Sequence, residues 1–282
     1  MLKEIEVYSD ETKEDISIYA YIKGSRTEIE AFRDKCNSVA QGAGLAKGSA
    51  LSSNALTVAE ELLSLLESSS LNVVLVLSDT EILSEATKTW IKRSRKCLER
   101  IENSANLNAT QKTVVSQRFT QLLPFFAASD PNDQSIVSLY PDNTGQWINH
   151  QNSIVTITSE EFGVSCDVDL KTFIGMSARA NAYDFTRIFG KKIPEIKLLE
   201  AQTDAVEIII CVADYLANFT LNYFRQAVGC TLSDKQNEKA RIIGGLFPKL
   251  GCPELIKFLN KLDGKLDFDI SSGLDRYVTQ LK

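Results

Sequence analysis

Residues 71–79 read Leu-Asn-Val-Val-Leu-Val-Leu-Ser-Asp, and this stretch decides the fold class. An apolar run of this kind is typical of a strand that is buried on both faces in a parallel or mixed sheet. The strand ends at Asp79, and a helical pattern follows from Glu81 to about Glu102. The stretch therefore predicts an α/β protein with a mixed sheet flanked by helices.

Upstream of this strand, the sequence predicts a β-hairpin followed by two helices. Residues 5–11 and 16–22 are β-branched and aromatic runs separated by a polar turn. The first helix begins at Thr27, whose hydroxyl pairs with Glu30 in the capping-box pattern, and continues to about Val39. The second covers residues 54–67, where apolar residues recur at helical spacing.

Downstream, the pattern alternates between helices and strands. It predicts a helix over 109–128, strands over 135–140, 153–158 and 195–200, a weak helix over 171–189 and a buried helix over 205–224. We interpret residues 1–225 as one core with inserted helices. We interpret residues 226–282 as a C-terminal helical appendage packed on that core.

Composition limits the classes of function. The chain has 282 residues, 44% of them hydrophobic, with a net charge of −6. No apolar run approaches the ~20 residues that span a bilayer, so we expect a soluble, cytoplasmic protein. Six cysteines stand singly, and His150 is the only histidine, which argues against cysteine catalysis or a zinc site.

The net negative charge of the chain disfavours binding nucleic acid by charge alone. Residues 92–96 (Lys-Arg-Ser-Arg-Lys) nevertheless form either a basic stripe or an ordinary solvated helix face.

Three aspartates stand where a polar group is costly. Asp10 lies on the first strand, Asp79 follows the buried strand, and Asp214 lies within the apolar helix. A buried carboxylate needs a partner or a cation, and clustered carboxylates at strand ends hold Mg²⁺ or Mn²⁺. Each also has a structural explanation: a turn at Asp10, a helix cap at Asp79 and a salt bridge at Asp214.

This order of elements resembles the ribonuclease H pattern. That family places an aspartate on its first strand, a glutamate at the start of its first helix and an aspartate after its fourth strand. Asp10, Glu60 or Glu61, and Asp79 match those positions. The resemblance implies a ribonuclease-H-like fold and a metal-dependent site.

A narrower similarity is to an uncharacterised prokaryotic ribonuclease-H-like family with an N-terminal Asp-Glu-Ser strand and a C-terminal Ala-Asp helix. Residues 8–12 (Tyr-Ser-Asp-Glu-Thr), 47–49 (Lys-Gly-Ser) and 213–215 (Ala-Asp-Tyr) carry it, within roughly residues 1–100 and 195–225. Thr12 replaces the serine of that motif. Because strand geometry puts Asp10 and Glu11 on opposite faces, we choose Asp10 as the ligand.

We therefore predict a nuclease that uses Mg²⁺ or Mn²⁺ and hydrolyses RNA or DNA, with Asp10, Asp79 and Asp214 as ligands and Glu61, or Glu60, completing the set. Lys47 would contact a phosphate. Asp142 is a further candidate ligand, but the local sequence favours an ordinary turn there. Such a nuclease would serve a prokaryotic defence or mobile-element system. The alternative is a catalytically inactive interaction or regulatory subunit of a larger complex.

Overall fold

The computed structural model describes most of the chain. The described residues are 3–14, 16–41, 47–79, 95, 99, 102–103, 105–129, 135–142, 147–159, 164–180, 194–203, 206–250, 256–258, 260–262 and 265–267. The helix predicted over residues 81–102 lies almost wholly outside them.

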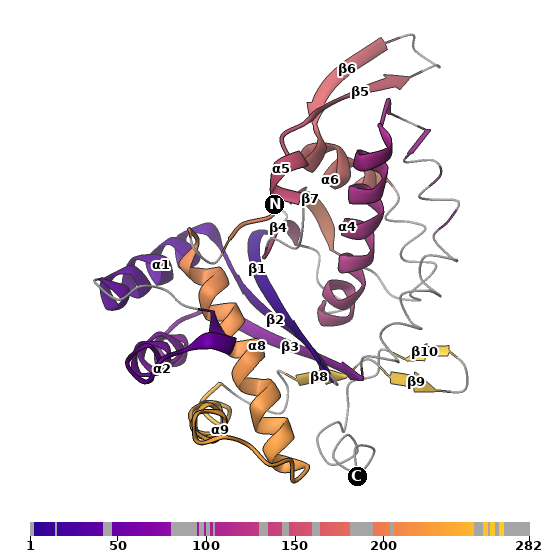
Figure 1. Cartoon of the computed structure of the whole chain (residues 1–282). Coiled ribbons are helices and arrows are strands. Elements are labelled where there is room, and N and C mark those ends of the chain that lie inside the picture. The colour runs from indigo at the N-terminus through magenta and orange to yellow at the C-terminus, as the bar shows by residue number, and fades with distance from the viewer. Residues whose placement is uncertain are drawn as a thin grey trace.

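A mixed sheet forms the centre of the molecule (Figure 1). Among the described residues its strand order is β7-β4-β1-β2-β3-β8. β2 is antiparallel to β1 and β3, whereas β4 is parallel to β1 and β7, and β8 is parallel to β3. The bounds are β1 (Glu4–Lys13), β2 (Ile16–Gly24), β3 (Asn72–Asp79), β4 (Ile136–Pro141), β7 (Glu195–Leu199) and β8 (Ile256–Phe258). The predicted hairpin and buried strand are confirmed.

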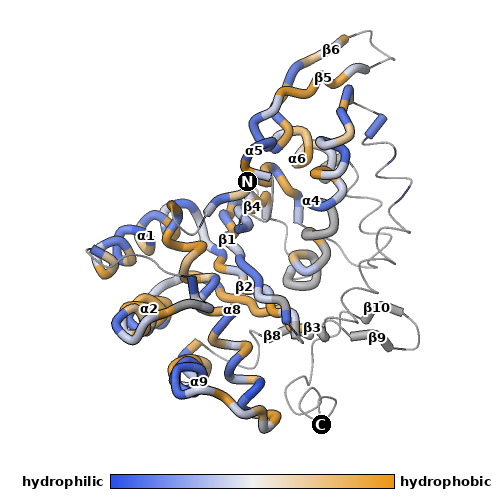
Figure 2. Tube along the Cα trace, in the orientation of Figure 1, coloured by the Kyte–Doolittle hydropathy of each residue, from blue (hydrophilic) through white to orange (hydrophobic). Residues whose placement is uncertain are grey.

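Helices cover both faces of this sheet, and each face has its own apolar core. One core packs against α4 (Ala109–Ala128), α5 (Trp147–His150) and α6 (Leu170–Ala180). The other packs against α1 (Arg26–Ala40), α2 (Ser53–Glu67), α8 (Ile208–Ala227) and α9 (Asp234–Leu246). Hydrophilic and apolar residues alternate along the helices that cover the sheet (Figure 2), as expected for helices with one buried side. The predicted α/β class, a mixed sheet flanked by helices, is confirmed.

The first helix begins earlier than the sequence predicts. The N-cap is Ser25, not Thr27, and its hydroxyl oxygen accepts the Glu28 backbone N–H. The Glu28 carboxylate in turn accepts the Ser25 backbone N–H at 2.7 Å, which completes a capping box. Both Ser25 and Thr27 are followed three residues later by a glutamate, so sequence spacing alone does not separate the two registers.

α8 lies across β1 and β2, and ion pairs hold it on both sides of Asp214. Near its start, the Arg33 guanidinium pairs with Glu207 at 3.1 Å and donates to the Tyr8 hydroxyl at 2.8 Å. Near its end, Arg225 pairs with Glu14, just beyond β1. These directional contacts add to the close apolar packing that holds α8 with one side toward β1.

The remaining elements extend from this core. β5 (Ile154–Ser159) pairs with β6 (Val164–Asp169), a strand that the sequence analysis did not identify, to form a projecting ribbon (Figure 1). After α9, two short strands, β9 (Asn260–Leu262) and β10 (Lys265–Asp267), pair with each other, and β8 joins the main sheet. The predicted domain boundary at residue 225 stays a prediction. Within the described residues, no helix combines the length and apolarity that a membrane crossing requires.

Replacing Arg33 by Met tests how α8 is held. We expect the free energy of unfolding to fall by about 1–3 kcal/mol, because the Glu207 carboxylate loses a charged partner in a setting where its side chain is only 14% exposed. Arg26→Met on the same helix removes an exposed i,i+4 pair with Glu30 and should cost less than about 0.5 kcal/mol. Urea unfolding of both variants makes the comparison, and equal losses would contradict this role for Arg33.

Candidate functional site

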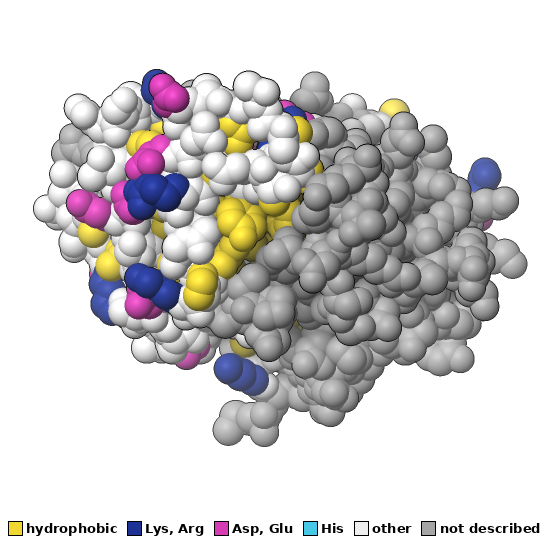
Figure 3. Space-filling model, turned by 90° about the horizontal axis from the view of Figure 1, so that it is seen from below, with side chains coloured by type: hydrophobic (Ala, Val, Ile, Leu, Met, Phe, Trp, Pro, Cys, Tyr) yellow, Lys and Arg dark blue, Asp and Glu magenta, His cyan; other side chains and the backbone are white. Residues whose placement is uncertain are grey.

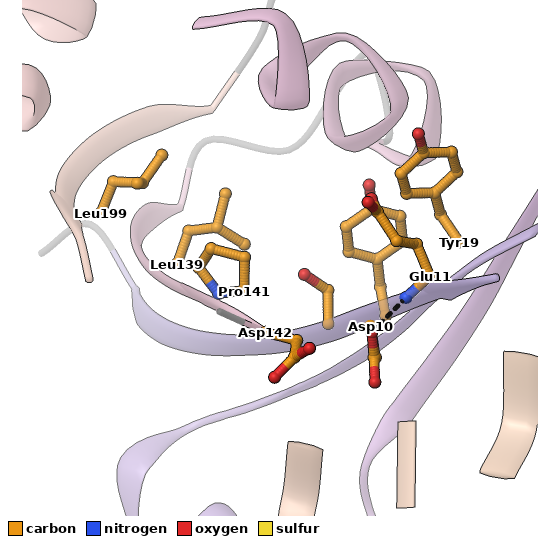
Figure 4. Close-up of a pocket in the computed structure, with 9 residues that line it drawn as sticks. Asp10, Glu11, Tyr19, Leu139, Pro141, Asp142 and Leu199 are labelled. Atoms are coloured by element: carbon orange, nitrogen blue, oxygen red, sulfur yellow. Dashed lines mark hydrogen bonds between the residues drawn. The ribbon is translucent and has the colours of Figure 1, made fainter. Parts of the chain in front are cut away.

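Asp10 and Glu11 point to opposite faces of β1, as the alternation of side chains along a strand requires. Asp10 lies on the face that α8 covers, and only 9% of it is exposed. Its Oδ1 atom accepts the Glu11 backbone N–H at 2.6 Å. Figure 4 shows Glu11 and Tyr19 directed toward the other side. Asp10 is therefore the carboxylate of this pair that faces α8.

Asp142 lies beside Asp10, because β4 runs parallel to β1. The pairing continues to Ser9 and Pro141, and the Asp142 N–H donates to the Ser9 carbonyl at 2.8 Å. On the side away from β1, the backbone of Asp142 forms an isolated parallel β-bridge with Gln202. The two aspartates point to the same side of the sheet (Figure 4). The sequence favoured a simple turn at Asp142, whereas the strand pairing places this residue at the site.

Asp214 is the third carboxylate near Asp10, and it comes from the middle of α8. Its Oδ2 atom accepts the Gly48 N–H at 2.6 Å, so the short helix η1 (Gly48–Ala50) sits directly on it. A Cβ atom on Gly48 would lie 3.1 Å from Cβ of Asn218 and 3.2 Å from Oδ1 of Asp214. Such contacts are tight, so glycine allows this close approach of the loop to α8.

The three carboxylates interact through their charges. Burial, with a further contribution from the nearby Asp142 and Asp214 charges, raises the pKa of Asp10 to about 9, although the hydrogen bond from the Glu11 N–H opposes this shift. Without a counter-charge, the Asp10 carboxyl is therefore protonated at neutral pH. Like charges gathered at a buried position are a common mark of functional sites.

A different network occupies the α4 face behind this site. Burial, followed by the charge and hydrogen bond of Glu11, raises the pKa of Tyr19 well above its ordinary value. Arg118 of α4 is 1% exposed, and its guanidinium lies 5.0 Å from the centre of the Trp147 ring. Burial lowers the pKa of Arg118 to about 10, against the attraction of Glu11 and Asp142. Glu11 thus serves a buried polar network and not the Asp10 side.

A pocket opens where β1 and β4 end (Figure 4). Its lining combines the two adjacent aspartates with the polar and apolar side chains of the α4 face. The lining residues are Ser9, Asp10, Glu11, Tyr19, Tyr21, Leu139, Pro141, Asp142 and Leu199.

The structure does not bring Asp79 to this site. Asp10 pairs with Ala20 and Ala20 with Leu75, whereas Asp79 lies four residues further along β3. With strands about 4.8 Å apart and about 3.3 Å per residue, the Cα atoms of Asp10 and Asp79 are separated by about 16 Å. The role of Asp79 as a ligand stays a prediction, and the register gives it no contact with Asp10.

The glutamates of α2 also lie apart from Asp10. Glu60 pairs with Arg241 of α9 at 3.2 Å, and Glu61 is exposed. The apolar side of α2, which holds Leu62 and Leu63, is the side packed into the core. The predicted ligand roles of Glu60 and Glu61 therefore have no support from their positions.

Lys47 and the basic stripe differ in their relation to the site. Lys47 is exposed and immediately precedes Gly48, whose N–H donates to the Asp214 carboxylate. The backbone of Lys47 therefore lies close to that carboxylate. Its predicted phosphate contact stays a prediction. Of the stripe at 92–96, only Arg95 is described, and it pairs with Glu99 at 3.0 Å.

The donor chemistry of Asp10, Asp142 and Asp214 fits a hard divalent cation. All three offer carboxylate oxygens, and the cost of holding Asp10 ionised next to two like charges would fall on binding a cation. In the described part of the chain, no three His, Cys, Asp or Glu side chains are already close enough to enclose an ion. Mg²⁺ does not require such a cage, because it commonly keeps several waters and binds one or two carboxylates.

No family model and no curated protein matches this sequence. Among solved structures, the chain is similar to Bst-RNase HIII in complex with Mn²⁺, with 11% identity and a TM-score of 0.32. A mutant protein of Bst-RNase HIII gives 13% identity and the same TM-score. Each alignment covers 89% of this chain and 65% of the other, so the chain spans about 65% of the length of these structures. Neither similarity is close enough to assign an activity.

Substituting Asp10 tests the electrostatic cost of the site. The folded pKa of about 9 exceeds the ordinary 3.8, so the contribution of Asp10 to stability is present below about pH 4 and is lost as the pH rises through about 9. Without added metal, Asp10→Asn should therefore stabilise the protein at pH 8, by about 1–2 kcal/mol, and by less at pH 5.

The control is Asp34→Asn, which changes an exposed aspartate of α1. Thermal unfolding at both pH values should show no comparable gain for it. A destabilised Asp10→Asn protein at pH 8 would contradict this account of the site.

Proposed function

We propose that the protein is a phosphodiesterase that cleaves RNA or DNA. It would use Mg²⁺ or Mn²⁺ held by Asp10, Asp142 and Asp214. The observation that carries this proposal is the buried Asp10 carboxyl, flanked by Asp142 on the parallel strand and facing Asp214 on α8. A purely structural site would pair such a group with a basic side chain, whereas here its main charged neighbours are acidic.

Each carboxylate has a distinct support, which suits it to hold a charged ligand in a fixed place. The strand backbone fixes Asp10 and Asp142, and the Gly48 N–H orients Asp214. A divalent cation held by these oxygens would stabilise negative charge on the phosphate as the ester bond breaks. Lys47, at the rim of the same loop, would contact a phosphate oxygen of the substrate.

The charge of the chain indicates a local mode of substrate binding. With a net charge of −6, the protein has no overall attraction for a polyanion. Figure 3 shows Lys and Arg side chains next to Asp and Glu side chains on the described part of one face. We therefore infer that contacts close to the cleavage point, mediated by the cation and Lys47, contribute more than a wide basic surface.

A second candidate is a catalytically inactive interaction or regulatory subunit of a larger complex. The absence of a ready-made three-ligand centre among the described residues favours it, as does the acidic balance. In that case Asp10 would remain a costly buried carboxyl beside two like charges. A biological role in prokaryotic defence or mobile-element control would suit either function.

Cleavage of end-labelled single- and double-stranded RNA and DNA with Mn²⁺ or Mg²⁺ tests the nuclease. We expect the wild-type protein to cleave at least one substrate and to lose activity in EDTA. Asp10→Asn, Asp142→Asn and Asp214→Asn should each reduce the rate by about 100-fold or more, because supporting residues around a metal already give 10- to 100-fold effects.

Two controls separate the site from its surroundings. Asp79→Asn should retain activity within about threefold, since its backbone lies about 16 Å from Asp10 on strand geometry. Asp34→Asn, on the surface of α1, should also remain active. A metal-dependent activity that disappears with Asp79 but survives the loss of Asp142 would overturn the proposed ligand set. No cleavage and no Mn²⁺ binding by the wild type would favour the inactive subunit.

A further inference from the structure

α9 contributes a lysine that is buried next to the carboxylate site. Lys239 is 5% exposed, and its ammonium donates to the Gly48 carbonyl and, at 3.0 Å, to Oδ1 of Asn218. It also lies 5.8 Å from the centre of the Phe219 ring. A buried ammonium costs several kcal/mol unless it is well paired, and both of these hydrogen-bond acceptors are uncharged.

The two acceptors of Lys239 lie on either side of Asp214. Gly48 accepts from Lys239 through its carbonyl and donates its own N–H to Asp214. Asn218 is four residues after Asp214 and therefore on the same side of α8. A chain of contacts thus connects the Lys239 ammonium, the Gly48 backbone and the Asp214 carboxylate.

The Lys239 ammonium and the Asp214 carboxylate attract each other. Burial lowers the pKa of Lys239 and the positive charge of Lys235 lowers it further, whereas the negative charge of Asp214 raises it. The attraction between Lys239 and Asp214 holds η1 and α8 together, with the Gly48 peptide between the two side chains. Gly48 lies directly against α8, since a Cβ atom added to it would be 3.1 Å from Cβ of Asn218.

We propose that Lys239 is a positioning residue for the carboxylate site, an inference that rests on the proposed function. Its ammonium seats η1 on α8, so that the Gly48 N–H orients the Asp214 carboxylate and Lys47 stays at the rim. α9 thereby supports the site without supplying any of the proposed ligands.

Measuring Mn²⁺ affinity separates two possible effects of Lys239, namely positioning of the Asp214 carboxylate and the electrostatic effect of its positive charge. Removing a positive charge near a carboxylate should, by electrostatics alone, tighten binding of a cation. Loss of positioning should instead weaken it. We expect Lys239→Met to weaken Mn²⁺ binding about 10-fold, within the range for residues that orient ligands, and Lys239→Gln to weaken it less because an amide can still donate.

The experiment is isothermal titration of Mn²⁺ into the full chain, with cleavage rates measured on the same preparations. Lys235→Met is the matched control, because it removes a positive charge from the exposed side of the same helix. Its Mn²⁺ affinity should stay within about twofold of the wild type. Circular dichroism confirms folding, and if Lys239→Met does not fold, Lys239→Gln decides the outcome.

Combining substitutions excludes a general loss of stability as the cause. In an Asp214→Asn background, Lys239→Met should lower the melting temperature but produce no further loss of Mn²⁺ affinity. Unchanged or tighter Mn²⁺ binding in folded Lys239 variants would overturn the positioning role and leave the proposed function intact. A wild-type protein that neither binds Mn²⁺ nor cleaves would overturn both.

Discussion

The packing of α8 along β1 is the constraint on which the rest of the structure depends. Most of α8 is apolar and buried, and ion pairs add directional contacts to its packing against β1 and β2. Arg33 pairs with Glu207 at the start of the helix, and Arg225 near its end pairs with Glu14. Asp214 lies between them, and its direction toward the Asp10 side of the sheet follows from this alignment.

The alternation along β1 then divides two kinds of polar chemistry between the faces of the sheet. Toward α4, the Glu11 charge meets Tyr19 and Arg118 in a network that includes a buried cation. Toward α8, Asp10 meets Asp142 and Asp214, and the repulsion is added to the cost of burial. Two consecutive residues of one strand thus belong to two different networks, and the one around Asp10, whose own charged neighbours are acidic, has the character of a binding site.

Local sequence patterns predict the helices and strands of this fold well. They do not predict which residues, far apart in the sequence, lie close together in the folded protein. The hairpin, α2, β3 and α8 each have a clear periodicity, and Asp10 and Asp214 were identified because a carboxylate in such a setting is unusual. Asp142 was assigned to a turn, since the parallel pairing of β1 and β4 joins residues more than 120 positions apart and leaves no local mark. The same limit applies to Lys239, whose polar α9 context gives no sign of burial, and to Asp79, whose distance from Asp10 depends on strand register.

The balance between stability and ligand binding explains how such a site can persist in a folded chain. Ionising Asp10 beside Asp142 and Asp214 costs stability, which raises the pKa of Asp10, while backbone N–H groups donate to the carboxylates of Asp10 and Asp214. A divalent cation would convert the same repulsions into attractions, and binding would release the Asp10 proton. Cation binding would then stabilise the folded protein, which is the behaviour expected of a site kept for binding and not for folding.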